Sequence, residues 1–140
     1  MTPSTTHKPP ESECLPRQAL LEDQHRRLRT LLSAVYGRNP FYTRKLDDAD
    51  VHVDTLKLPD DLHTLPLTTK QELTIDQDTS PPWGTAHTEP FDHYTRYSQT
   101  SSTTGKPLRW LDTTASWQWM LECWKAVYHA AGVDSTDRIF

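Results

Sequence analysis

The sequence of 140 residues has only four glycines, only two cysteines and no long apolar run. Cys14 and Cys123 lie far apart and match no zinc-binding or CxxC spacing, so they fit a reduced setting better than a metal or redox site. No stretch approaches the roughly 20 apolar residues of a membrane span. The first residues lack the apolar centre of a signal peptide. We therefore expect a cytoplasmic protein with no membrane partner.

The sequence is also short of basic charge and of hydrophobic residues. Its net charge is −4, and its lysines and arginines are scattered, so we expect no nucleic-acid partner. Hydrophobic residues make up 34 % of the chain, so it has room for one domain with a modest core. Five tryptophans and five tyrosines nevertheless supply enough apolar area to argue against full disorder.

The first half of the sequence predicts helices after a flexible tail over residues 1–16, which is rich in Thr, Ser, Pro and charge. An apolar stripe predicts a helix from Arg17 that ends near Gly37. A second short helix is expected from Phe41 to about Ala49. Further along, the sequence predicts one helical turn at 60–62, a turn at 70–73 capped by Thr68 or Thr69, and a loop over 76–90.

The second half predicts a strand, a hydroxyl-rich loop, a second strand and a long helix. Tyr and Thr favour strands on either side of the loop, over residues 93–99 and 108–111. Thr113 or Thr114 can cap the long helix, and Gly132 can end it. The expected class is therefore α/β, with a helical front half, then a β-hairpin and a long helix.

One segment of the chain has residues suited to chemistry, the run Thr100-Ser-Ser-Thr-Thr-Gly-Lys-Pro107. Hydroxyls, successive backbone N–H groups and a lysine suit the oxygens of a polyphosphate, and Gly105 allows close backbone approach. The run is not a Walker loop, which needs Gly at Thr100 and Ser or Thr at Pro107. On composition alone, such a run is more often a solvated loop.

Several blocks together resemble the phenylacetate-CoA ligase branch of the adenylate-forming superfamily. The loop resembles that superfamily's SSGTTGKP phosphate-binding loop. Asn39-Pro-Phe-Tyr42 resembles the branch's NPFY turn, and residues 62–73 resemble its DL..LP.TTK.DL stretch. Residues 130–139 resemble its AAGV..GDRV stretch. The resemblance runs from about residue 20 to the last residue, and the blocks keep their order.

The resemblance implies that residues 17–140 are the incomplete N-terminal part of an AMP-forming acid–CoA ligase. Its substrates would be a small carboxylic acid, ATP and CoA, with Mg²⁺ on the phosphates. The loop residues would contact the ATP phosphates, while the Mg²⁺ and CoA sites and the catalytic residues would lie outside this chain. We therefore expect the isolated chain to be inactive. The implied ATP-binding residues are Ser101, Ser102, Thr103, Thr104, Gly105 and Lys106.

The sequence departs from that pattern at Ser102, where the family usually has glycine. If the loop needs a positive φ there, serine costs about 1 kcal/mol or more and makes the loop stiffer.

Other side-chain groups have ordinary structural interpretations. The histidines show no HxxxH or HxH spacing, so no metal site is expected. Trp117, Trp119 and Trp124 could line an aromatic ligand site, but at helical spacing they are more typical of a core. The acidic residues at 47, 48 and 50 lack the glycine and closing glutamate of a calcium loop, and we interpret them as solvated charge at a helix end.

Two functions outside the enzyme class stay open at this point. The chain could be a non-catalytic truncated gene product or an interaction module that keeps the family's scaffold. It could also be a free-standing phosphate binder that uses only the hydroxyl loop.

Overall fold

The computed structural model describes residues 15–101 and 106–138, and there it confirms the predicted mixed class of helices with one hairpin. Most of the predicted tail, residues 1–14, lies outside the described residues. The two strands form an antiparallel sheet. The elements are, in order, α1 (Arg17–Val35), α2 (Pro40–Asp48), the 3-10 turn η2 (Asp60–Thr64), α3 (Lys70–Thr79), the 3-10 turn η3 (Phe91–His93), β1 (Tyr94–Gln99), β2 (Arg109–Thr113) and α4 (Thr114–Ala130).

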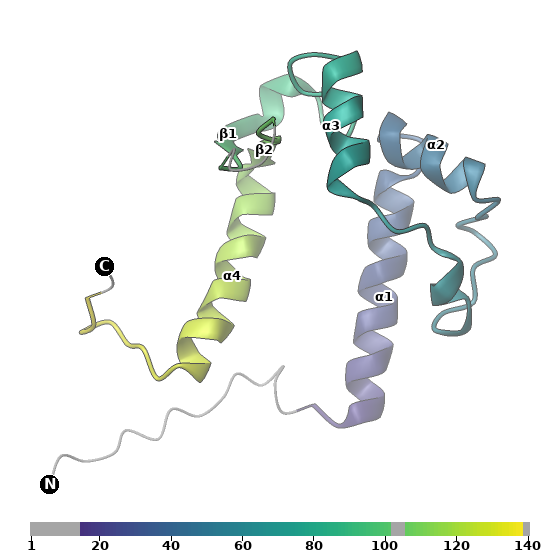
Figure 1. The fold of residues 1–140 in the computed structure, drawn as a ribbon. Helices are drawn as coiled ribbons and strands as arrows, with labels where there is room; N and C mark the ends of the chain where they lie inside the picture. The colour runs from purple at the N-terminus through teal and green to yellow at the C-terminus, as the bar shows by residue number, and fades with distance from the viewer. Residues whose placement is uncertain (1–14, 102–105, 139–140) are drawn as a thin grey trace, which may run out of the picture.

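The elements form an open arch rather than a closed layer structure. In Figure 1, the two long helices α1 and α4 stand apart from each other, while α3 and the β1–β2 hairpin lie between their upper ends. The shorter helix α2 lies beside α1. The hairpin therefore connects the α3 side of the molecule to α4.

Side-chain caps set the predicted helix boundaries. The Asn39 side chain accepts a hydrogen bond from the Tyr42 N–H at 3.1 Å, and Pro40 occupies the first turn of α2. Thr113 caps α4 by accepting from the Ser116 N–H at 3.0 Å. Gly132, just beyond α4, has a φ of +72°, which is the left-handed conformation expected of a residue that ends a helix.

Among the described residues, two small clusters of buried apolar side chains make the core, and α2 contributes to both. Leu46 packs with three residues of the following loop, and Phe41 packs with α3 and the start of the second strand segment. Since Leu46 and Phe41 both lie on α2, this helix links the two clusters. Burial of apolar area is the main stabilising term in folding. The clusters are Leu46, Val51, Val53 and Leu56, and Phe41, Leu73 and Leu108.

The expectation of a loop over residues 76–90 is wrong for its first four residues, because α3 continues to Thr79. The weak helical preference of this Asp- and Thr-rich stretch is overridden by tertiary contacts. The Asp76 carboxylate accepts hydrogen bonds from Thr85, and the Gln77 side chain bonds to the backbone of Arg109. Both contacts need an intact last turn of α3.

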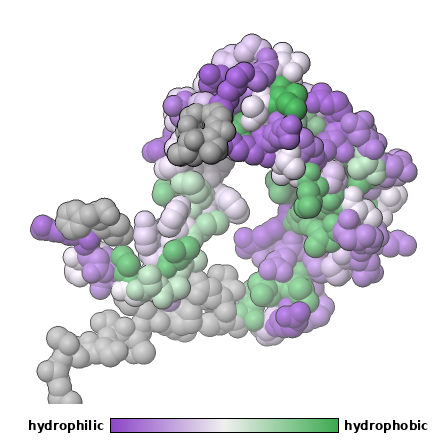
Figure 2. Space-filling view, in the orientation of Figure 1, coloured by the Kyte–Doolittle hydropathy of each residue, from purple (hydrophilic) through white to green (hydrophobic). Residues whose placement is uncertain are grey.

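The interpretation of Trp119 and Trp124 as core residues is also wrong, since their exposed fractions are 66 % and 47 %. None of the residues of α4, all of which the structure describes, is buried, because β1 and β2 are the main elements that pack against it. Of the three tryptophans of α4, only Trp117 is half-buried, with the guanidinium of Arg96 3.9 Å from its ring centre. In Figure 2 an opening separates α1 from α4.

A groove of about 800 Å³ lies between α1 and α4. Leu28, Leu31 and Ala34 line it on the α1 side, and Trp119 lines it on the α4 side. Within residues 15–101 and 106–138, no helix is both long enough and apolar enough to cross a bilayer.

Candidate functional site

The predicted phosphate loop is the connection between the two strands of the hairpin. The Thr100 N–H donates to the Leu108 carbonyl at 2.9 Å, and the Leu108 N–H donates to the Thr100 hydroxyl at 3.0 Å. Leu108 is only 3 % exposed and belongs to the core. This pair closes the base of the loop, so the loop emerges from a fixed stem.

The structure places two of the predicted ATP-binding residues on opposite limbs of this loop. Ser101 follows Thr100 directly, Lys106 lies two residues before Leu108, and both are exposed. The other predicted site residues, Ser102, Thr103, Thr104 and Gly105, lie outside the described residues. The phosphate-binding assignment of all six remains a prediction.

Helix α3 holds the second limb of the loop through Gln77. The Gln77 side-chain amide donates to the Arg109 carbonyl at 2.7 Å, and its oxygen accepts from the Arg109 N–H at 3.1 Å. One glutamine side chain thus pairs with both backbone groups of the first residue of β2. The Arg109 guanidinium donates to the Pro82 carbonyl at 2.9 Å, which ties the same residue to the loop after α3.

The last turn of α3 also binds the lysine of the predicted site. The Lys106 Nζ lies 2.9 Å from one carboxylate oxygen of Asp78 and 2.8 Å from the other. Both side chains face solvent, with exposed fractions of 69 % for Lys106 and 49 % for Asp78. Lys106 therefore already has an anionic partner in this structure.

The loop after α3 folds back onto a buried carboxylate. The Asp76 side chain is 6 % exposed and accepts from the backbone N–H and the hydroxyl of Thr85, each at 2.6 Å. Gly84 passes this carboxylate with a φ of +73°, and a Cβ there would lie 2.2 Å from the nearer Asp76 oxygen. Glycine is required here both by the backbone conformation and by the lack of space.

A capping box fixes the first turn of α3. The Thr69 hydroxyl accepts from the Glu72 N–H at 3.3 Å, and the Glu72 carboxylate accepts from the Thr69 N–H at 2.7 Å. The ammonium of Lys45 on α2 also donates to this carboxylate. The hydrogen bond from Lys45, followed by those from Thr69, lowers the pKa of Glu72 from 4.5 to about 2. The cap therefore fixes α3 against α2 with an ionised carboxylate.

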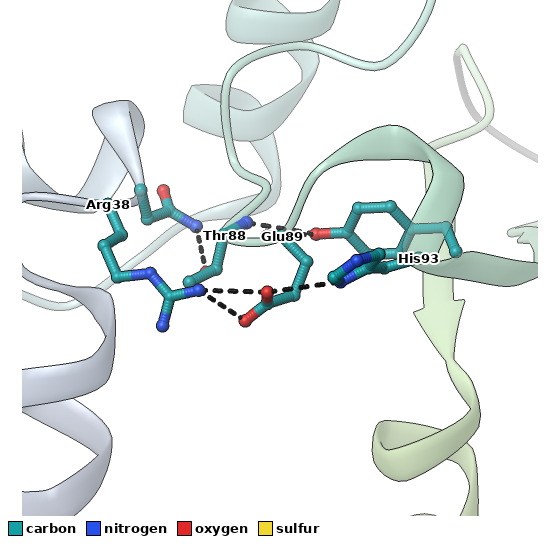
Figure 3. Close-up of polar contacts among 6 residues, drawn as sticks. Arg38, Thr88, Glu89 and His93 are labelled. Carbon is teal, nitrogen blue, oxygen red and sulfur yellow. Dashed lines mark hydrogen bonds and ion pairs between the residues drawn. The ribbon is translucent and has the colours of Figure 1, made fainter.

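A second polar network, shown in Figure 3, joins the turn between α1 and α2 to the start of β1. The Arg38 guanidinium lies 2.9 Å from both carboxylate oxygens of Glu89, and His93 Nδ1 lies 3.7 Å from one of them. The Tyr94 hydroxyl accepts from the N–H groups of Thr88 and Glu89 at 3.0 and 3.1 Å. These contacts hold the hairpin in place from its other end.

The exposed end of the hairpin offers a hydroxyl and an ammonium group on a stem that is fixed from two sides. Such groups can bind the oxygens of an anionic, phosphate-like ligand. Among the described residues, no group of three or more His, Cys, Asp or Glu side chains could hold a metal ion.

No model of a known protein family matches the chain. Two curated relatives do match it, and both are named phenylacetate-coenzyme A ligase. The relative from Thermus thermophilus is 39 % identical over 98 residues, which is 70 % of this chain and 21 % of the relative. The relative from Escherichia coli K12 is 38 % identical over 84 residues, which is 60 % of this chain and 18 % of the relative. The chain is a relative of the phenylacetate-coenzyme A ligases. It spans about a fifth of the length of these ligases.

Solved structures of CoA ligases share the fold of this ligase relative. A 2-hydroxyisobutyryl-CoA ligase in complex with 2-HIB-AMP and CoA matches with a TM-score of 0.76 and 25 % identity. The match covers 88 % of this chain and 26 % of that ligase. The same ligase with R3-HIB-AMP matches with a TM-score of 0.84 over 98 % of this chain and 29 % of that ligase, at 21 % identity. The resemblance predicted from the motifs is thus confirmed.

The sequence did not indicate that three residues in the last turn of α3 belong to the site region. They are Asp76, Gln77 and Asp78. The sequence predicts a loop for this stretch, and nothing in the local sequence indicates that it contacts Thr85, Lys106 and Arg109. The pairing of β1 with β2 and the packing of Leu73 on Leu108 help to bring these segments together.

Proposed function

We propose that this chain is the N-terminal part of an ATP-dependent, AMP-forming ligase that joins a carboxylic acid to CoA. Two curated relatives carry the name phenylacetate-coenzyme A ligase, and the structural neighbours are ligase complexes with an acyl-AMP and CoA. An aryl or acyl carboxylic acid is the substrate class, and the cytoplasm, where ATP and CoA occur together, is the proposed location. Residues 17–140 would form an incomplete ligase domain after a flexible tail over 1–16.

The observation that carries this proposal is the fixed hairpin stem with Lys106 and Ser101 at its exposed end. Preorganised donors are usually the largest contribution to catalysis of such transfers, and preorganisation requires a rigid support. The stem is closed by Thr100 and Leu108 and is held by Gln77, so its end does not depend on ligand for its position.

The proposed reaction has two steps. A carboxylate oxygen of the acid attacks the α-phosphorus of ATP, and the bond from that phosphorus to the bridging oxygen breaks, which releases pyrophosphate. The CoA thiol then loses its proton to solvent and its sulfur attacks the acyl carbon, and AMP leaves with the bonding electrons of the acyl–oxygen bond. In the first step, the Lys106 ammonium and the Ser101 hydroxyl would donate to β- and γ-phosphate oxygens and so stabilise the departing charge.

Mg²⁺ would neutralise phosphate charge when bound, but the described residues offer no cluster to hold it. By resemblance to the ligases, we propose that the Mg²⁺ and CoA sites lie in other parts of the complete enzyme. What this chain would contribute is positioning: the lysine, the loop hydroxyls and the rigid stem.

The exposed apolar surface agrees with a role as one part of a larger domain. Trp119, Trp124 and Val127 on α4 are exposed, and Leu31 on α1 is 58 % exposed. Large apolar side chains gathered on facing elements usually mark surfaces that another segment covers. In the proposed ligase, the rest of the domain would cover this groove.

A chimaera with the E. coli ligase tests the proposal. Residues 17–140 would replace the corresponding part of that ligase, placed by the 84 residues over which the two proteins align. Phenylacetate-dependent thioester formation would then be measured. We expect the chimaera to form the thioester and the isolated 140-residue chain to form none. A folded chimaera without thioester formation would contradict the proposal and favour a non-catalytic scaffold or interaction module. The chimaera counts as folded if its CD spectrum and its unfolding transition match those of the E. coli ligase.

A further inference from the structure

The feature that the proposed function leaves unexplained is the partner of Lys106. Its ammonium lies within 2.9 Å of both oxygens of Asp78, although the proposal gives this ammonium to phosphate oxygens. A carboxylate and a phosphate compete for the same donor hydrogens, because both accept charge-assisted hydrogen bonds.

The position of Asp78 makes this competition stronger. It is the penultimate residue of α3, where unpaired carbonyl groups place partial negative charge, and α3 has no basic residue of its own in that turn. An acidic side chain is electrostatically unfavourable at such an end. Lys106 is thus held by a full negative charge and by the negative end of a helix.

The fold does not need this ion pair to hold the loop in place. The second limb is already fixed by Leu108 in the core and by the two hydrogen bonds between Gln77 and Arg109. An ion pair as exposed as this one contributes little to folding stability. Its main effect is therefore on the charge that Lys106 presents to a ligand.

We propose that Asp78 is a competing counter-ion that occupies Lys106 until a polyphosphate displaces it. This inference rests on the proposed function, because it assumes that Lys106 binds the phosphates of ATP. It assigns Asp78 a positioning role that opposes ligand binding: the carboxylate pairs with the ammonium at the end of α3, and a polyphosphate that binds has to compete with that contact. Removing the carboxylate charge then strengthens polyphosphate binding.

Calorimetric titration of the full 140-residue chain with inorganic tripolyphosphate at low ionic strength tests this inference. Asp78→Asn removes the competing charge, and Asp54→Asn is the matched control, since it changes the net charge equally at an exposed loop position. We expect Asp78→Asn to bind roughly two- to fivefold more tightly than Asp54→Asn, the range that an exposed ion pair supports. Asp78→Glu keeps the charge and should bind as the unchanged chain does.

Two further measurements separate competition from a merely structural effect. In the Lys106→Gln background, the gain from Asp78→Asn should vanish, since the carboxylate acts only through the ammonium. At about 0.15 M salt, where the Debye length is about 8 Å, the gain should shrink.

The possible results separate the two proposals. If Asp78→Asn equals Asp54→Asn, or binds more weakly, while Lys106→Gln still weakens binding, the counter-ion role is overturned and the phosphate role of Lys106 stands. If Lys106→Gln leaves tripolyphosphate binding unchanged in every background, both proposals are overturned.

Discussion

Replacing Gly84 with alanine should be among the most damaging single changes to this chain. Its φ of +73° costs an alanine about 1–2 kcal/mol on its own. The added Cβ would also lie 2.2 Å from the Asp76 carboxylate, which accepts two hydrogen bonds from Thr85. Moving that buried carboxylate weakens at least one charge-assisted bond, worth about 1.5–3 kcal/mol. We expect a total loss in the free energy of unfolding of about 3 kcal/mol or more.

The chain offers a matched control at Gly37. This residue has a similar φ of +78°, but a Cβ there would meet nothing within 4 Å. Gly37→Ala should therefore cost only the backbone share of about 1–2 kcal/mol. Urea unfolding followed by circular dichroism gives both free energies.

A double-mutant cycle isolates the clash. With Asp76→Ala in place, the obstructing carboxylate is gone and the nearest remaining neighbour of the added Cβ is the Gln77 Cγ at 3.1 Å. The cost of Gly84→Ala should therefore fall towards that of Gly37→Ala. The reasoning is refuted if Gly84→Ala and Gly37→Ala cost the same in the otherwise unchanged chain. It is also refuted if the cost of Gly84→Ala persists in the Asp76→Ala background.

Three further predictions follow from the other contacts. The pKa of Glu72 is lowered from 4.5 to about 2, so its contribution to stability is complete above pH 4.5 and is lost as the pH falls towards 2; Glu72→Gln should flatten acid unfolding in this range, and Glu22→Gln should not. Trp119 is 66 % exposed beside the groove, so Trp119→Gln should lower dye binding and self-association of the isolated chain. ANS fluorescence and sedimentation measure these two quantities, and unchanged values would argue that this groove is not the apolar surface responsible. In the chimaera, Ser102→Gly should raise the adenylation rate by freeing the loop backbone, and a slower rate would give Ser102 a positive role.

The sequence was sufficient to predict helix boundaries that are set by residues next to the helix. The predicted caps Thr69, Thr113 and Gly132 lie next to the helices that they bound, and the structure confirms them. The cap at Asn39, by contrast, was not among the predictions. The family motifs were sufficient for the relationship to the phenylacetate-CoA ligases.

The rest depended on contacts between distant segments. The last turn of α3 exists because Asp76 and Gln77 bond to residues 9 and 32 positions away, which no local pattern reveals. The tryptophans of α4 fit a core pattern, but a periodic stripe shows only that a helix face is apolar, and not that another element covers it. The pairing of Lys106 with Asp78 also needed the three-dimensional arrangement, since the two residues are 28 positions apart.

We propose that Lys106 on the hairpin loop binds the phosphates of ATP in an acid–CoA ligase. Phenylacetate-dependent ATP–pyrophosphate exchange by the chimaera tests this most directly, because exchange reports the first step alone. Losing one charge-assisted contact costs about 1.5–3 kcal/mol, so Lys106→Ala should slow exchange roughly tenfold to a hundredfold. Lys57→Ala, an exposed lysine on the loop between α2 and η2, should leave it unchanged. Exchange by Lys106→Ala at the rate of its parent would contradict the claim.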